Sequence, residues 1–156
     1  MNPPHHDIAT APSPTLPWRS LDIAGPNGRI PLRLYRPASD VRLPLVIYLH
    51  GGGFVAGSLD DADAAARFIA AGLPAAVLSV GYALAPAHPF PAAPEDAYAA
   101  TLWAVEHAAT LGADGLVLFC NPRLATLLGR SRERLTGTAF EALLPPAQRE
   151  SIAELL

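Results

Sequence analysis

The 156-residue chain contains no lysine, and all 11 of its basic residues are arginines. Charged residues make up only 16% of the chain, against a typical share of about 25%. Hydrophobic residues make up 51%, so the composition favours burial in a core and excludes an intrinsically disordered chain. The net charge of −3 argues against general nucleic-acid binding.

Only one cysteine is present, Cys120, which excludes an internal disulfide and makes a reducing, cytoplasmic setting the expected one. No stretch approaches the roughly 18 apolar residues of a membrane span. The first residues lack the basic segment and apolar core of a secretory signal, so we expect none. His5 and His6 could bind a metal, but two adjacent histidines in a disordered arm are more often solvated, so we expect neither a metal site nor a cofactor. Residues 1–17 are rich in proline and predict a flexible arm.

Between residues 18 and 114 the sequence shows alternating strand and helix patterns. Segments 20–24 and 30–35 flank Asn27-Gly28, a pair typical of hairpin turns, so they predict an antiparallel hairpin. Segments 45–49 and 75–80 are apolar throughout, which is typical of buried parallel strands. A helix is expected over 60–71, capped by Ser58 or Asp60. The order strand, helix, strand, helix predicts a parallel sheet with covering helices.

A second helix is expected from Pro94 onward. Four prolines between positions 86 and 94 predict no regular structure before Pro94, which itself suits a first helical turn. Helical spacing predicts one shared face for Tyr98, Leu102, Val105 and Ala109. Gly112 follows as an expected stop.

The strand at 45–49 leads directly into the sequence HGGGF at positions 50–54. Glycine has no Cβ, so Gly51, Gly52 and Gly53 allow a sharp turn that exposes backbone N–H groups. Such groups at the end of a strand are what an oxyanion hole requires, because they stabilise negative charge on an attacked carbonyl oxygen. The competing interpretation is an ordinary glycine-rich turn after a buried strand.

Together with SVGYALAPAHPFPAAPEDAY at positions 79–98, the HGGGF sequence resembles the first half of hormone-sensitive-lipase-like esterases, which have the α/β-hydrolase fold. The resemblance runs from about residue 18 to residue 114. It implies a small acyl-ester substrate, oxyanion donors at Gly51 and Gly52, support from Gly53, and a structural role for His50. Three positions that usually carry Asp, Arg and Glu in that family are Gly81, Ala83 and Ala87 here. This difference predicts a reduced polar network around the site.

The nucleophile of that family lies in a Gly-x-Ser-x-Gly turn after the next strand, predicted here at 116–119. The sequence at positions 118–122 is LFCNP, with neither serine nor glycine, and no histidine follows His107. Cys120 falls near the expected place, but a buried free thiol is the better interpretation. The resemblance therefore implies carboxylic-ester hydrolysis, while the chain is expected to be truncated before its nucleophile and inactive alone.

The sequence GLVLFCNPRLATLLG at positions 115–129 is followed by SRERLTGTAFEALLP at positions 131–145. A strand ending at Asn121, a short leucine-rich helix closed by Gly129 and a second helix with Leu135 before Gly137 are expected here. In these features residues 115–156 resemble the front part of a PAS sensor domain. The alternatives are an amphipathic helical tail with Leu124, Leu127 and Leu128 as core contacts, or a strand at 116–119 that pairs beside 45–49. A non-catalytic sensor or interaction module, a subunit completed by another chain, and a fused or truncated reading frame therefore compete with the esterase hypothesis.

The predicted architecture is α/β. It consists of an arm at 1–17, an incomplete α/β-hydrolase sheet at 18–114 with an N-terminal hairpin, parallel strands and covering helices, and a helical PAS-like fragment at 115–156. Too little chain remains to cover the apolar strands, so self-association through an exposed sheet edge is expected.

Overall fold

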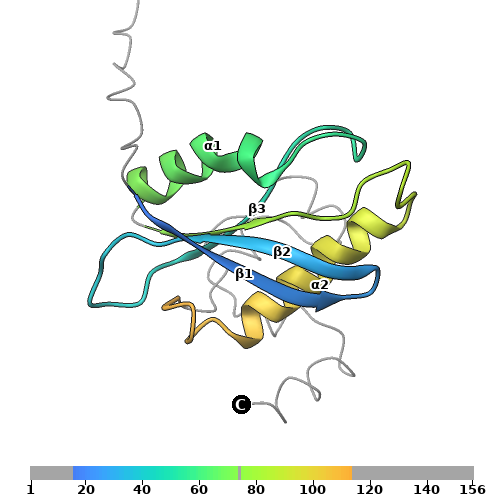
Figure 1. Ribbon diagram of the computed structural model, residues 1–156. Coiled ribbons are helices and arrows are strands. Elements are labelled where there is room, and N and C mark those ends of the chain that lie inside the picture. The colour runs from blue at the N-terminus through green and yellow to red at the C-terminus, as the bar shows by residue number, and fades with distance from the viewer. Residues whose placement is uncertain (1–15, 74, 114–156) are drawn as a thin grey trace, which may run out of the picture.

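The computed structural model describes residues 16–73 and 75–113 (Figure 1). Its elements are β1 (Trp18–Gly25), β2 (Gly28–Tyr35), β3 (Leu45–Leu49), α1 (Leu59–Gly72), β4 (Ala76–Val80) and α2 (Ala92–Glu106). The predicted strand at 116–119, Cys120, the PAS-like fragment and nearly all of the predicted arm lie outside the described residues.

The strands form one mixed sheet of four strands in the order β1-β2-β4-β3. The predicted hairpin is confirmed, with β1 antiparallel to β2 and Gly25 opposite Gly28 at the turn. β4 is antiparallel to β2 and parallel to β3, and Ile47 lies opposite Leu78. Helix α1 connects the two parallel strands, which confirms the predicted strand–helix–strand unit.

Helices cover the two faces of the sheet (Figure 1). Because successive residues of a strand point to opposite faces, β4 contributes to two separate clusters. Val77 packs with Tyr35 and with Ala66 and Ala70 of α1. Leu78 packs on the other face, in the larger cluster that includes Ala100 of α2. All five β4 residues are buried, as expected for a strand with helices on both sides.

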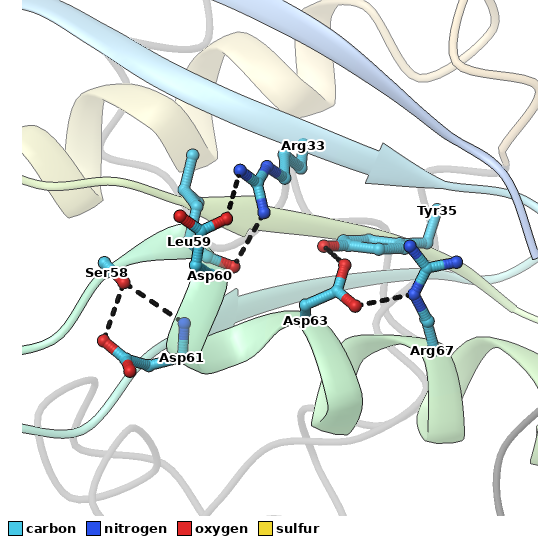
Figure 2. Close-up of polar contacts among 8 residues, drawn as sticks. All are labelled: Arg33, Tyr35, Ser58, Leu59, Asp60, Asp61, Asp63 and Arg67. Carbon is cyan, nitrogen blue, oxygen red and sulfur yellow. Dashed lines mark hydrogen bonds and ion pairs between the residues drawn. The ribbon is translucent and has the colours of Figure 1, made fainter. Parts of the chain in front are cut away.

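Helix α1 is attached to the sheet by polar contacts at its first turns (Figure 2). Ser58 caps the helix by accepting from the Asp61 N–H at 3.1 Å, which confirms one of the two predicted caps. Arg33 of β2 donates to Asp60 at 2.6 Å. The Tyr35 hydroxyl donates to Asp63 at 2.8 Å, so both strand side chains reach across to the helix.

The predictions for α2 were wrong in three details. The helix ends at Glu106, six residues before the predicted stop at Gly112. The helix begins at Ala92, two residues before Pro94, because the first N–H groups of a helix have no intrahelical partner and a proline there loses no bond. Its buried face is formed by Ala92, Ala93, Asp96, Ala100 and Ala104.

The predicted stripe is not the buried face. Tyr98 is 45% exposed, Ala109 is exposed, and Leu102 and Val105 are only partly buried. The sheet surface is already filled by strand side chains, so the helix turns its alanines inward and approaches closely. Large side chains on the same helix are therefore left at the rim.

Strand β3 lies at one edge of the sheet. Within residues 16–73 and 75–113 its only strand partner is β4. Just before β3, Leu43 forms a parallel bridge with Ala113, and its N–H donates to the Gly112 carbonyl at 3.0 Å. The chain that leaves α2 therefore runs beside the segment that enters β3.

Candidate active site

The candidate site is the loop of residues 50–54, called the glycine loop here, which follows the carboxyl end of β3. Because β3 and β4 are parallel, the segment 81–91 that follows β4 starts at the same edge of the sheet. The two segments are in direct contact, since the Ala85 N–H donates to the Phe54 carbonyl at 2.9 Å. This position at the carboxyl ends of parallel strands is where α/β sheets bind ligands.

The glycine loop has backbone conformations that favour glycine. Gly52 has φ +131° and Gly53 has φ +61°. A Cβ on Gly52 would lie 1.9 Å from the Ala56 carbonyl oxygen, so no larger residue fits this backbone. The Gly52 carbonyl accepts from the N–H groups of Val55 at 3.2 Å and Ala56 at 3.1 Å, which closes the turn.

The N–H groups of Gly51, Gly52 and Gly53 are available to a ligand. All three glycines are exposed. Within the described part of the chain, none of these N–H groups has a hydrogen-bond acceptor. A backbone N–H without a partner carries a partial positive charge, so the three together offer a short run of donors for an anionic oxygen.

Tyr82 holds the start of the glycine loop from the segment after β4. Its hydroxyl donates to the His50 carbonyl at 2.5 Å. The two rings are stacked with centroids 4.3 Å apart and an angle of 14° between their planes. Both residues are 6% exposed. Burial raises the pKa of the Tyr82 hydroxyl, so the group keeps its proton and remains a donor.

The His50 side chain holds the next peptide of the loop. Its Nδ1 lies 2.9 Å from the Gly51 carbonyl oxygen. A carbonyl oxygen only accepts hydrogen bonds, so this contact requires the proton on Nδ1. Gly57 lies close to both atoms of this contact. A Cβ on Gly57 would lie 2.3 Å from His50 Nδ1 and 2.4 Å from the Gly51 carbonyl oxygen.

A buried carboxylate supports the segment after β4. Asp96 is 3% exposed and sits in the first turns of α2. One of its oxygens accepts from the Ala83 N–H at 3.0 Å, and the other accepts from the Asn27 amide at 3.3 Å. Ala83 is one of the three positions without the family's polar side chain. Its backbone still takes part in the support of the site.

The structure brings His50, Gly51, Gly52 and Gly53 together in one loop, while Cys120 lies outside the described residues. The sequence interpretation missed Tyr82, Gly57 and the buried Asp96. Tyr82 had a usable signal, because it stands two residues after the last residue of β4 and thus at the edge of the sheet that carries the glycine loop.

Residues 16–73 and 75–113 contain no cluster of three or more His, Cys, Asp or Glu side chains arranged to hold a metal ion. None of their helices is long and apolar enough to cross a membrane.

The sequence that forms this loop and sheet is similar to those of known proteins. Residues 46–120 match the family described as alpha/beta hydrolase fold. Esterase LipI from Mycobacterium tuberculosis (strain ATCC 25618 / H37Rv) is 50% identical over 104 residues, which cover 65% of this chain and 32% of the relative. Hormone-sensitive lipase from Bos taurus is 41% identical over 91 residues, which cover 58% of this chain and 12% of the relative.

Solved structures agree with these relatives. The esterase from Pyrobaculum calidifontis superposes with a TM-score of 0.63 at 46% identity, covering 65% of this chain and 33% of that chain. The thermophilic carboxylesterase EstE1, from a metagenomic library, gives a TM-score of 0.63 at 40% identity, covering 69% of this chain and 36% of that chain. The chain thus spans about a third or less of the length of these relatives.

Residues 18–113 therefore have part of the α/β-hydrolase fold, as a partial mixed sheet of four strands. Over the matched region the chain is similar to esterases and lipases, since the relatives and the structural neighbours described above are proteins of those kinds.

Proposed function

We propose that residues 18–113 supply the oxyanion-hole part of a carboxylic-ester hydrolase that acts on small acyl esters. The observation that carries this proposal is the row of exposed N–H groups at Gly51, Gly52 and Gly53 without acceptors among the described residues. Donors placed in advance at a strand end stabilise the oxyanion of an acyl-transfer reaction without reorganisation. Gly51 and Gly52 are the proposed donors, and Gly53 supports them.

We further propose that the 156-residue chain does not hydrolyse esters by itself. Its sequence contains no Gly-x-Ser-x-Gly, and no histidine follows His107. An oxyanion hole without an activated nucleophile leaves only a small residual rate over water. The chain should show no saturable turnover of p-nitrophenyl butyrate and no stoichiometric labelling by a fluorophosphonate serine probe. Turnover that Cys120→Ala abolishes would instead identify the thiol as a nucleophile.

The oxyanion role is tested separately by restoring the missing part of the site. Residues 18–113 would replace the corresponding segment of the Pyrobaculum calidifontis esterase, to which this chain is 46% identical over the matched region. In an active chimera, Gly52→Val should lower kcat by about 10²- to 10³-fold, the usual effect of losing an oxyanion donor.

The matched control in the chimera is Gly72→Ala. A Cβ there meets no atom within 4 Å, and this glycine lies at the end of α1 without a positive φ. Its kcat should stay unchanged. A folded chimera in which Gly52→Val retains full activity would overturn the proposed oxyanion role.

The cytoplasmic location and the PAS-like character of residues 115–156 stay predictions from sequence. The first depends on the single cysteine, and the second on a resemblance over about forty residues.

A further inference from the structure

The direction of each N–H group in the glycine loop is set by the carbonyl of the same peptide unit. A trans peptide is planar, so its C=O and its N–H point in opposite directions. A contact that holds the carbonyl oxygen of one residue therefore also orients the N–H of the following residue. Three consecutive peptide units of the loop are held in this way.

The carbonyl of His50 accepts from the Tyr82 hydroxyl at 2.5 Å, which orients the Gly51 N–H. The carbonyl of Gly51 lies 2.9 Å from His50 Nδ1, and this contact orients the Gly52 N–H. The carbonyl of Gly52 accepts from the N–H groups of Val55 and Ala56, which orients the Gly53 N–H. Only the first two peptides depend on side chains.

We propose that Tyr82 is a positioning residue that directs the Gly51 N–H through the His50 carbonyl and, by stacking on the His50 ring, also directs the Gly52 N–H. This inference rests on the proposed oxyanion function. The stacked ring holds His50 where its Nδ1 reaches Gly51, at a ring separation of 4.3 Å. The Tyr82 hydroxyl oxygen also lies 3.2 Å from His50 Nδ1, so this one oxygen contacts both the carbonyl and the ring of His50.

A tyrosine hydroxyl on the other face of the sheet serves as the control. The Tyr35 hydroxyl donates to Asp63 at 2.8 Å (Figure 2). Tyr82→Phe and Tyr35→Phe each remove one buried hydroxyl and keep the ring. Tyr82→Phe should lower the folded-to-unfolded ratio about fivefold, as expected for one lost neutral hydrogen bond. Tyr35→Phe should lower it about tenfold or more, because its hydroxyl bonds a charged carboxylate. Only the first should affect the glycine loop.

The test uses the full chain labelled with ¹⁵N. In Tyr82→Phe the amide signals of Gly51 and Gly52 should shift or broaden, while those of Gly72 stay in place. Tyr35→Phe should leave all three unchanged despite its lower stability. Unchanged Gly51 and Gly52 signals in Tyr82→Phe, or equal changes in both variants, would overturn the proposal by showing that Tyr82 contributes stability alone.

A second measurement covers the case in which Tyr82→Phe does not fold. Side-chain ¹⁵N shifts of neutral His50 in the unmodified chain should show the proton on Nδ1, and a proton on Nε2 would overturn the proposal. Gly57→Ala adds a methyl group 2.3 Å from Nδ1 and should move the Gly52 signal more than the Gly51 signal. These NMR measurements need no turnover. They can therefore refute the positioning role of Tyr82 while the chimera still supports the oxyanion role, and the chimera can refute the oxyanion role while the NMR signals still support the positioning role.

Discussion

Asp63 joins α1 to the sheet, and Asp63→Asn measures the strength of that connection (Figure 2). One carboxylate oxygen accepts from the Tyr35 hydroxyl at 2.8 Å, and the other accepts from Arg67 Nε at 2.7 Å. The Tyr35 residue is fully buried, while the Asp63 side chain is 31% exposed. An asparagine keeps one acceptor but turns its NH₂ group toward the second donor.

The expected loss follows from these two contacts. A hydrogen bond to a charged group contributes about 1.5–3 kcal/mol. The partly buried Arg67–Asp63 pair is also an i,i+4 ion pair, and such pairs on helices add about 0.3–0.5 kcal/mol. Since asparagine retains part of one contact, we expect Asp63→Asn to lower the free energy of unfolding by about 2 kcal/mol near neutral pH. Urea denaturation with an unchanged m-value is the assay.

The stability difference between the unmodified chain and Asp63→Asn should depend on pH. The hydrogen bond from Arg67, together with that from Tyr35, holds the pKa of Asp63 below its ordinary value of 3.8. A carboxylate with a lowered pKa in the folded state stabilises the protein above the unfolded-state pKa, and this stabilisation is lost as the pH falls through the folded-state pKa. The gap between the unmodified chain and Asp63→Asn should therefore narrow as the pH falls below 3.8.

Asp40→Asn is the matched control, because it removes the same charge from an exposed residue. Its stability should follow that of the unmodified chain at each pH. Equal free energies of unfolding for Asp63→Asn and the unmodified chain near neutral pH would refute the reasoning. So would a difference in free energy that stays the same size in acid.

Two further predictions concern packing and the sheet edge. Ala100 of α2 is fully buried against the sheet, so Ala100→Leu should destabilise the fold by about 1–3 kcal/mol. Ala109→Leu, at an exposed position just after that helix, should not, as measured by urea denaturation. Light scattering after size exclusion should show oligomers, which we expect to form through the edge strand β3. Leu49 on that strand is 46% exposed, and Leu49→Lys should lower the fraction of oligomers. A monodisperse monomer before any substitution would contradict the second prediction.

Local sequence patterns determined much of the described fold. Asn27-Gly28 predicted the hairpin, and in the structure Gly28 has the positive φ of +124° that favours glycine, whereas Asn27 has no positive φ. The apolar run at 45–49 predicted β3, and Ser58 predicted the start of α1. The HGGGF sequence identified the loop of the candidate site. Each of these signals acts over a few residues, so one sequence was sufficient to find it.

Tertiary structure decided which residues face one another. Helical spacing grouped Tyr98 with Leu102, but the sheet surface selected Ala100 and Ala104 as the buried side, because only small residues allow α2 to approach closely. Likewise, Tyr82 and His50 are separated by 32 residues in sequence. They meet because β3 and β4 are parallel and end at one edge of the sheet. The order of strands and helices predicted that parallel pair, but not which side chains would contact each other beyond its end.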